Sequence, residues 1–189
     1  MLFRSAALDA GQQRRLTPAL AEYQAAVAAN ADRPAWRSRH AVWLASRGRR
    51  SEAVAELETA LRLDPDYTPA SINLADLYRE LGRDDDAETI LLRGLARDPG
   101  SAGLEHALGL LRARQRRYPE ALAALSRAAQ LAPGEAAYRY AEAVALNSLG
   151  RRREAIAALE RHQAQGRTSR REAALLASLR ARAPDRTKP

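Results

Sequence analysis

Three histidines are the side chains of this chain best suited to acid–base or metal chemistry: His40, His106 and His162. They lie far apart in the sequence, at three different positions of the repeat described below, and show no metal-ligand spacing. We expect His106 on the inner face of a helix, where it can contact a ligand. We expect His40 to be partly buried and hydrogen-bonded. The histidines therefore predict neither a metal centre nor an acid–base catalyst.

Motifs for other kinds of catalysis are also absent from the sequence. It contains neither G-x-x-x-x-G-K-[ST] nor G-x-G-x-x-G, and its Ser, His and Asp residues follow no catalytic pattern. The absence of Cys excludes a disulfide, a thiolate metal site, a catalytic Cys and covalent haem attachment within the chain. The acidic run Asp84 to Asp86 falls where a helix begins and complements the helix dipole. We expect no enzymatic activity and no cofactor.

The composition favours closely packed helices. Hydrophobic residues make up 46% of the 189 residues, but much of this is Ala, with one Phe, two Trp and six Tyr. Strands favour β-branched and aromatic residues, so this composition argues against a β-sandwich. No run of 18 apolar residues occurs, and the N-terminal stretch lacks the apolar segment of a signal peptide. We expect a cytoplasmic protein, or a periplasmic one if the chain belongs to a longer exported protein.

A fixed sequence period organises the chain. Pro65, Pro99 and Pro133 are equally spaced, and two amphipathic runs joined by a short turn lie between consecutive prolines. At the same period a small residue recurs at Ala19, Ala53, Ala87, Ala121 and Ala155. An acid precedes it at Glu52, Asp86, Glu120 and Glu154, and a bulky residue follows four positions later at Tyr23, Leu57, Leu91, Leu125 and Leu159. A helix, a turn and a second helix therefore repeat about every 34 residues.

These positions are those of the pattern W-x2-L-G-x2-Y…A-x3-F…P, and over roughly residues 1–167 the chain resembles the tetratricopeptide repeat (TPR) family. The resemblance implies an all-α, right-handed α-solenoid of about five helix-turn-helix repeats and a C-terminal capping helix. The expected parts are a degenerate first repeat 1–33, four repeats 34–67, 68–101, 102–135 and 136–169, a capping helix 170–182 and a disordered tail 183–189. Ser169 and Glu172 form the capping box of the last helix.

The physical basis of the pattern is close helix approach. Small residues are needed where two backbones cross at the short end of the range of interaxial distances. A large side chain at Ala87 or Ala121 is expected to cost roughly 1–3 kcal/mol through overpacking. Gly48, Gly82 and Gly150 end the first helices of their repeats, where a left-handed residue is preferred.

The resemblance also implies a concave binding face lined by the first helices. Its expected residues are Arg39, Val42, Ile72, Asn73, Asp76, Arg79, His106, Leu110, Tyr140, Val144 and Asn147. Such a mixed surface suits an extended peptide or a helix of a protein partner, although these residues could also serve only to keep the inner face soluble. Asn73 matches one position of the carboxylate clamp that some TPR proteins use for chaperone C-termini. The other clamp positions do not match, so we expect no chaperone-tail capture.

The arginines suggest a second surface. The formal net charge is +8, Lys188 is the only lysine, and Arg15, Arg49, Arg83, Arg117 and Arg151 recur at the same period on the turn between paired helices. This basic edge permits binding to nucleic acid or an anionic surface. A cation at the C-terminus of each first helix also complements its dipole, and no aromatic residues interleave the edge as a single-strand stacking platform requires.

A third alternative is a structural spacer or oligomerisation module of a larger bacterial protein. Residues 140–151 look similar to TPR tails attached to bacterial multihaem cytochromes, and the preference for Arg over Lys and the abundance of Ala favour a bacterial source. The sequence leaves the partner and the oligomeric state open.

Overall fold

The computed structural model describes residues 32–164, 166 and 168–181, together with the isolated positions 18, 21, 22, 25 and 29. Within these residues every regular element is an α-helix and no strand occurs. The expected tail 183–189, Arg15 and almost all of the degenerate first repeat lie outside the described residues. No helix in the described ranges is both long and apolar enough to cross a membrane.

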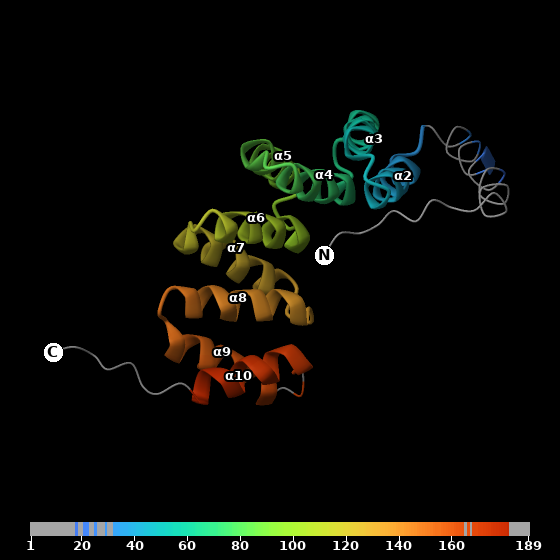
Figure 1. The fold of residues 1–189 in the computed structure, drawn as a ribbon. Coiled ribbons are helices and arrows are strands. Elements are labelled where there is room, and N and C mark those ends of the chain that lie inside the picture. The colour runs from blue at the N-terminus through green and yellow to red at the C-terminus, as the bar shows by residue number, and fades with distance from the viewer. Residues whose placement is uncertain are drawn as a thin grey trace. The chain divides into compact units, whose positions relative to one another are not determined.

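The chain divides into two compact units, residues 1–70 and 71–189, which are described separately. In the first unit α2 (Pro34–Ser46) packs on α3 (Arg50–Leu63). The helix α4 (Thr68–Glu80) begins at the C-terminal end of the first unit and continues into the second unit. In the second unit each helix from α5 to α10 packs on the next along the chain, and Figure 1 shows α6 to α10 stacked in this order. The helices are α2 (Pro34–Ser46), α3 (Arg50–Leu63), α4 (Thr68–Glu80), α5 (Asp84–Arg97), α6 (Ala102–Arg114), α7 (Tyr118–Leu131), α8 (Ala136–Ser148), α9 (Arg152–Ala164) and α10 (Arg170–Ala181). The expected all-α helical repeat solenoid is confirmed.

The recurring small residues lie where the paired helices cross. Ala53, Ala121 and Ala155 are completely buried. The Leu four residues after each of them is also buried and fills the space beside the crossing. Small side chains let the backbones approach, and leucines supply the apolar area that stabilises the contact.

Two glycines mark the closest approaches. A Cβ atom added to Gly109 of α6 would lie 2.5 Å from Cγ of Leu125 and 3.2 Å from the carbonyl oxygen of Ala121, both on α7. A Cβ atom at Gly94 of α5 would lie 2.9 Å from Cδ1 of Leu104 on α6. At Gly109 even a methyl group therefore overlaps the neighbouring helix.

A left-handed residue ends the first helix of each repeat from residue 34 onward. Gly48, Gly82 and Gly150 have φ angles of 78°, 74° and 74°, as expected, and Arg116 takes the same position with φ 62°. The N–H of the next residue then bonds a carbonyl five positions earlier, as from Arg117 to Arg112 at 2.9 Å. A side chain makes this conformation unfavourable, so Arg116 is a strained member of the series.

We expect Gly109→Ala to lower the free energy of unfolding by about 1–2 kcal/mol, because overpacking against Leu125 outweighs the higher helix propensity of Ala. Urea denaturation measures the change. Gly134→Ala is the control, since a Cβ atom there meets no atom within 4 Å. A Gly109→Ala protein as stable as the wild type would show that the α6–α7 contact is looser than described.

Replacing the strained residue Arg116 by glycine is expected to stabilise the fold. Arg116→Gly should raise the free energy of unfolding by about 1 kcal/mol, because it removes the left-handed strain. Gly82→Ala places a side chain at the equivalent turn in open space and should lower stability by a similar amount. Thermal melting of both variants checks the pair. If the Arg116→Gly protein were less stable than the wild type, the left-handed conformation of Arg116 would not be a source of strain.

Candidate functional site

An apolar hollow of about 430 Å³ opens in the second unit. Leu110 of α6 and Val144 of α8 line it, although 38% and 37% of these residues remain exposed to solvent. The described residues that line it are His106, Leu110, Ala113, Tyr118, Leu125, Ala136, Ala137, Tyr140, Ala141, Val144, Ala145, Ser148, Ser169 and Arg171. Two large apolar side chains thus face solvent beside a concave, alanine-rich surface.

Small residues leave this hollow unfilled. α6 and α8 are the first helices of adjacent predicted repeats, and they contact each other directly. The lining of α8 is dominated by alanines, among them the buried Ala141 and Ala145, which allow a close approach but fill little volume. The alanine content that the helix crossings require therefore also creates space for a side chain from outside the unit.

The imidazole of His106 lies at the edge of this apolar surface. Its ring centroid is 4.6 Å from that of Tyr138. Burial lowers the pKa of His106, and the nearby carboxylate of Asp76 only partly opposes this effect. Burial therefore favours the neutral form of the imidazole.

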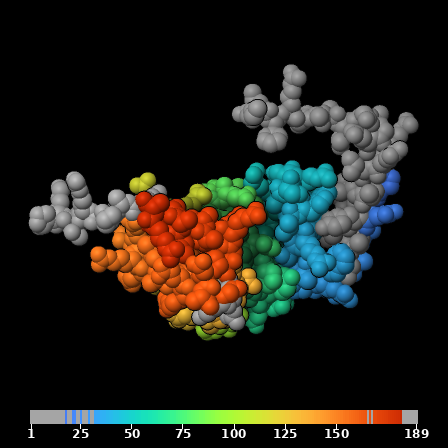
Figure 2. Space-filling view, turned by 90° about the horizontal axis from the view of Figure 1, so that it is seen from below, coloured from blue at the N-terminus to red at the C-terminus, as the bar shows by residue number. Residues whose placement is uncertain are grey.

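A buried ion pair holds α10 in place and so positions Ser169 and Arg171. Arg139 of α8 donates to both carboxylate oxygens of Glu172 on α10, at 3.0 and 3.2 Å, and to the carbonyl of Pro133 at 2.7 Å. Arg139 is 2% exposed and Glu172 is completely buried. Figure 2 shows α10, in red, lying with α9 and α8, in orange, at this end of the second unit.

Glu172 also completes the capping box predicted at the start of α10. Its carboxylate accepts a hydrogen bond from the Ser169 N–H at 2.8 Å, and its own N–H donates to the Ser169 hydroxyl at 3.3 Å. Burial raises the Glu172 pKa, but the bonds from Arg139 and Ser169 outweigh it and hold the pKa below its usual value. The capping box is confirmed, and the same carboxylate ties two helices together.

His162 of α9 completes this cluster. Its Nδ1 lies 3.5 Å from Oε1 of Glu172. Burial and the charge of Arg139 lower the pKa of His162, against the opposing effect of Glu172. His162 therefore lies beside the carboxylate that anchors α10. The described residues contain no group of three His, Cys, Asp or Glu side chains that could hold a metal ion.

The structure brings together four of the predicted groove residues: His106, Leu110, Tyr140 and Val144 all line the hollow. Ile72 lies close to α6, since a Cβ atom at Gly103 would be 3.0 Å from its Cδ1. Asp76 accepts a hydrogen bond from Arg79 at 2.8 Å, and Asn73 and Asn147 are half-buried. None of these five lines the hollow.

Two further groove positions, Arg39 and Val42, belong to α2 of the first unit. Val42 is 54% exposed, and the guanidinium of Arg39 lies over the Trp36 ring, 6.0 Å from its centroid. They are exposed positions of that unit.

Each arginine of the basic edge that the structure describes pairs with the acid three residues later. Arg49 donates to Glu52 at 2.6 Å, Arg83 to Asp86 at 2.7 Å and Arg151 to Glu154 at 2.7 Å. The hydrogen bonds in the first and last of these pairs raise the arginine pKa and lower the glutamate pKa. Each of these arginines thus binds an acid in the first turn of the second helix, which balances its charge. Arg83 also lies over the Tyr78 ring near the C-terminus of α4, 4.3 Å from the ring centroid.

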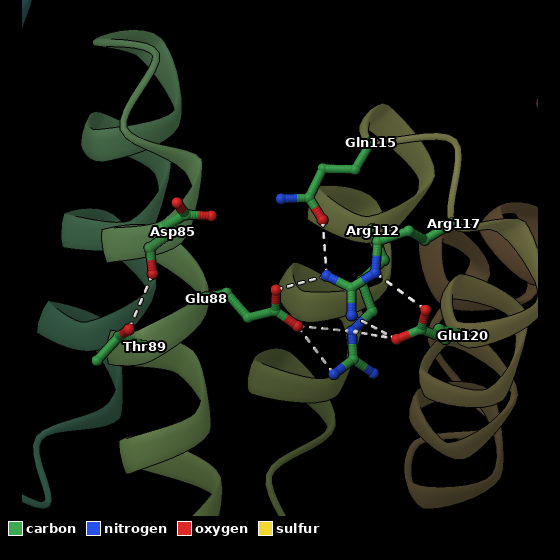
Figure 3. A network of polar contacts seen from close by, with 7 residues as sticks. All are labelled: Asp85, Glu88, Thr89, Arg112, Gln115, Arg117 and Glu120. Atoms are coloured by element: carbon green, nitrogen blue, oxygen red, sulfur yellow. Dashed lines mark hydrogen bonds and ion pairs between the residues drawn. The ribbon is translucent and has the colours of Figure 1, made fainter.

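The fourth arginine of the edge, Arg117, belongs to a larger network (Figure 3). It binds Glu120 and also donates to Glu88 of α5 at 2.6 Å, while Arg112 of α6 donates to Glu88 at 3.0 Å. Burial raises the Glu88 pKa, but the bonds from Arg117 and Arg112 outweigh it and lower the pKa overall. This network connects α5, α6 and α7.

Two models of the tetratricopeptide repeat family match the chain, one at residues 44–111 and the other at residues 106–170. Together they span residues 44–170, more than half of the 189 residues. The chain belongs to the tetratricopeptide repeat family. The TPR resemblance drawn from the repeating small residues is therefore confirmed, and TPR repeats support a general role as a protein-interaction scaffold.

A known TPR protein resembles part of the chain. The TPR repeat-containing thioredoxin TTL4 of Arabidopsis thaliana is 45% identical over 69 residues, which are 36% of this chain and 10% of that protein. This chain therefore spans only a tenth of that relative.

Solved structures show the same fold. TTC0263, a thermophilic TPR protein of Thermus thermophilus, aligns with a TM-score of 0.69 and 23% identity over 88% of this chain and 91% of its own. YrrB, described as a TPR protein with an unusual peptide-binding site, aligns with a TM-score of 0.59 and 21% identity over 73% of this chain and 71% of its own. At these identities the likeness shows the TPR fold alone.

The family's Trp position, followed along the chain, indicates ion pairs that were not predicted from the sequence, and the pair of Arg139 and Glu172 is the buried one among them. That position holds Arg37 and then, one period further each time, Ser71, Glu105 and Arg139. Arg37 pairs with Glu56 at 2.7 Å and Glu105 with Arg127 at 2.9 Å, as Arg139 does with Glu172. Polar residues recurring at an apolar family position were the available signal.

We expect Glu172→Gln to lower the free energy of unfolding by about 3–5 kcal/mol, because it leaves the Arg139 charge buried without its partner. Hydrogen exchange should show the largest loss of protection in α10. The double variant Arg139→Met, Glu172→Leu should recover most of the stability, since it removes both charges. Equal losses in the single and double variants would contradict the ion-pair account.

Proposed function

We propose that this TPR chain is a non-catalytic scaffold that binds a peptide or helix of a protein partner in the hollow between α6 and α8. The observation that carries the proposal is the exposure of Leu110 and Val144 beside an alanine-rich concave surface. Large apolar side chains next to a concavity lose contact with water when a partner's side chains enter it.

The size of the hollow sets the expected strength of binding. Burying one large apolar side chain contributes roughly 1.5–3 kcal/mol, while association costs at least about 4 kcal/mol in lost freedom of movement. One anchor is therefore insufficient. Several anchors in a volume of about 430 Å³ fit a dissociation constant on the order of micromolar, about −8 kcal/mol.

The basic edge gives little support to the alternative of nucleic-acid or anionic-surface binding. Arg49, Arg83, Arg117 and Arg151 each bind a carboxylate. A phosphate would have to compete with an acid that is already in place, and pairing of opposite charges weakens the long-range field that attracts polyanions. The spacer alternative assigns no role to the exposed Leu110 and Val144.

A peptide selection tests the groove proposal. A random peptide library displayed on phage is selected on the wild-type chain, and the selected peptides are synthesised and titrated by fluorescence anisotropy. We expect Leu110→Asp and Val144→Asp each to weaken binding at least tenfold, because a carboxylate replaces apolar contact area. Circular dichroism confirms that the variants are folded.

Leu92→Asp is the matched control for the selection. Leu92 lies on α5, is 45% exposed and does not line the hollow. Its replacement makes the same kind of change to a comparably exposed apolar residue, so peptide affinity should stay within about twofold of the wild type. Peptides that tolerate Leu110→Asp, or a selection that enriches none, would support the spacer alternative instead.

A further inference from the structure

We propose that the partner segment presents a side-chain carboxylate, Asp or Glu, to Arg171 next to the apolar side chains that enter the hollow. This inference rests on the proposed function and names the chemistry of its partner. It starts from the charge of the lining: Arg171 contributes a cation, and no carboxylate lines the hollow within the described residues.

Arg171 forms no hydrogen bond or ion pair with any residue that the structure describes, and its side chain is exposed. The acid beside it in the chain, Glu172, is turned inward and bound by Arg139 and Ser169. Burial lowers the pKa of His106, the histidine of the lining, and so favours its uncharged form. Among the residues that the structure describes, the positive charge of Arg171 therefore has no counterion at the hollow.

The position of Arg171 in its helix is unfavourable for α10 itself. The first turn of a helix favours acids, because the N-terminal end of the helix dipole is positive. α5 follows this preference with Asp84, Asp85 and Asp86, whereas α10 begins with Arg170 and Arg171 and places its first-turn acid, Glu172, only after them. Helix stability thus gives no reason for Arg171, and a carboxylate from a partner would complement both the guanidinium and the dipole.

The source of the carboxylate follows from the same surroundings. A chain terminus is typically bound by several converging donors, whereas Arg171 is the single arginine among the described residues of the lining. A guanidinium can bind one carboxylate through two parallel N–H···O hydrogen bonds, in a bidentate geometry. An internal Asp or Glu next to apolar anchors fits this arrangement, and it would set the register of the segment in the hollow.

Charge exchange tests the inference with the peptides selected on the wild-type chain. They are acetylated and amidated, so that their terminal charges are removed, and each Asp or Glu is replaced in turn by Asn or Gln. We expect one such replacement to weaken binding to the wild type roughly threefold to tenfold, as an ion pair partly shielded by apolar contacts does. On Arg171→Gln the same replacement should change affinity less than twofold.

Two protein variants complete the design. Arg171→Glu should prefer the peptide in which Lys replaces the acid, which reverses the charge pair. Arg170→Gln is the matched control, because Arg170 lies in the same turn of α10 but does not line the hollow. It should leave every affinity within about twofold of the wild-type value.

The outcomes separate this inference from the proposed function. Peptides that lose affinity with Leu110→Asp but bind Arg171→Glu as well as the wild type would overturn the inference and leave the groove intact. Peptides that bind only with a free C-terminal carboxylate would also overturn it. A selection without any peptide sensitive to Leu110→Asp would overturn the proposed function and the inference together.

Discussion

Helices α6 and α7 approach each other so closely that one methyl group at Gly109 would overlap Leu125. The rest of the second unit depends on this close approach. It requires glycine or alanine at each crossing, and leucine beside the crossing to supply buried apolar area. It also requires short turns, which a left-handed residue provides in each repeat even where that residue is Arg116. The hollow between α6 and α8 has the same origin. Alanines permit the close packing of two helices, but they leave unfilled volume where a third helix does not pack against them.

Charged residues in this protein act mainly between near neighbours. At the start of each second helix an arginine binds the acid three residues later, and Glu88, Arg112 and Arg117 extend one such pair across three helices. These exposed pairs orient the turns but neutralise the edge. The buried pair of Arg139 and Glu172 differs, because desolvation makes either partner alone highly unfavourable. It connects α8 to α10 and thereby sets the position of Arg171 at the hollow.

Membership of the TPR family fits a scaffold role, and the chemistry of the surface refines it. The hollow offers apolar contact area from Leu110 and Val144, while Arg171 supplies a charge without a counterion among the described residues. In the proposed complex, apolar area would provide most of the binding free energy, and the charge of Arg171 would provide register and selectivity. Separating these two contributions is the reason for comparing Leu110 variants with Arg171 variants.

The sequence by itself determined the features that depend on residues close together in the chain. The sequence period predicted the helical repeats, Gly48, Gly82 and Gly150 predicted the turns, and Ser169 with Glu172 predicted a cap that the structure confirms. The recurring arginines and acids were visible too, but their pairing across three residues was not recognised. Only the tertiary structure decided which predicted groove residues share a hollow, that Arg171 joins His106, Leu110, Tyr140 and Val144 there, and that Glu172 meets Arg139 at a separation of 33 residues. The physical reason is that turns and caps are local interactions specified by a few adjacent residues, whereas contacts between helices depend on how side-chain volumes fit when the helices pack.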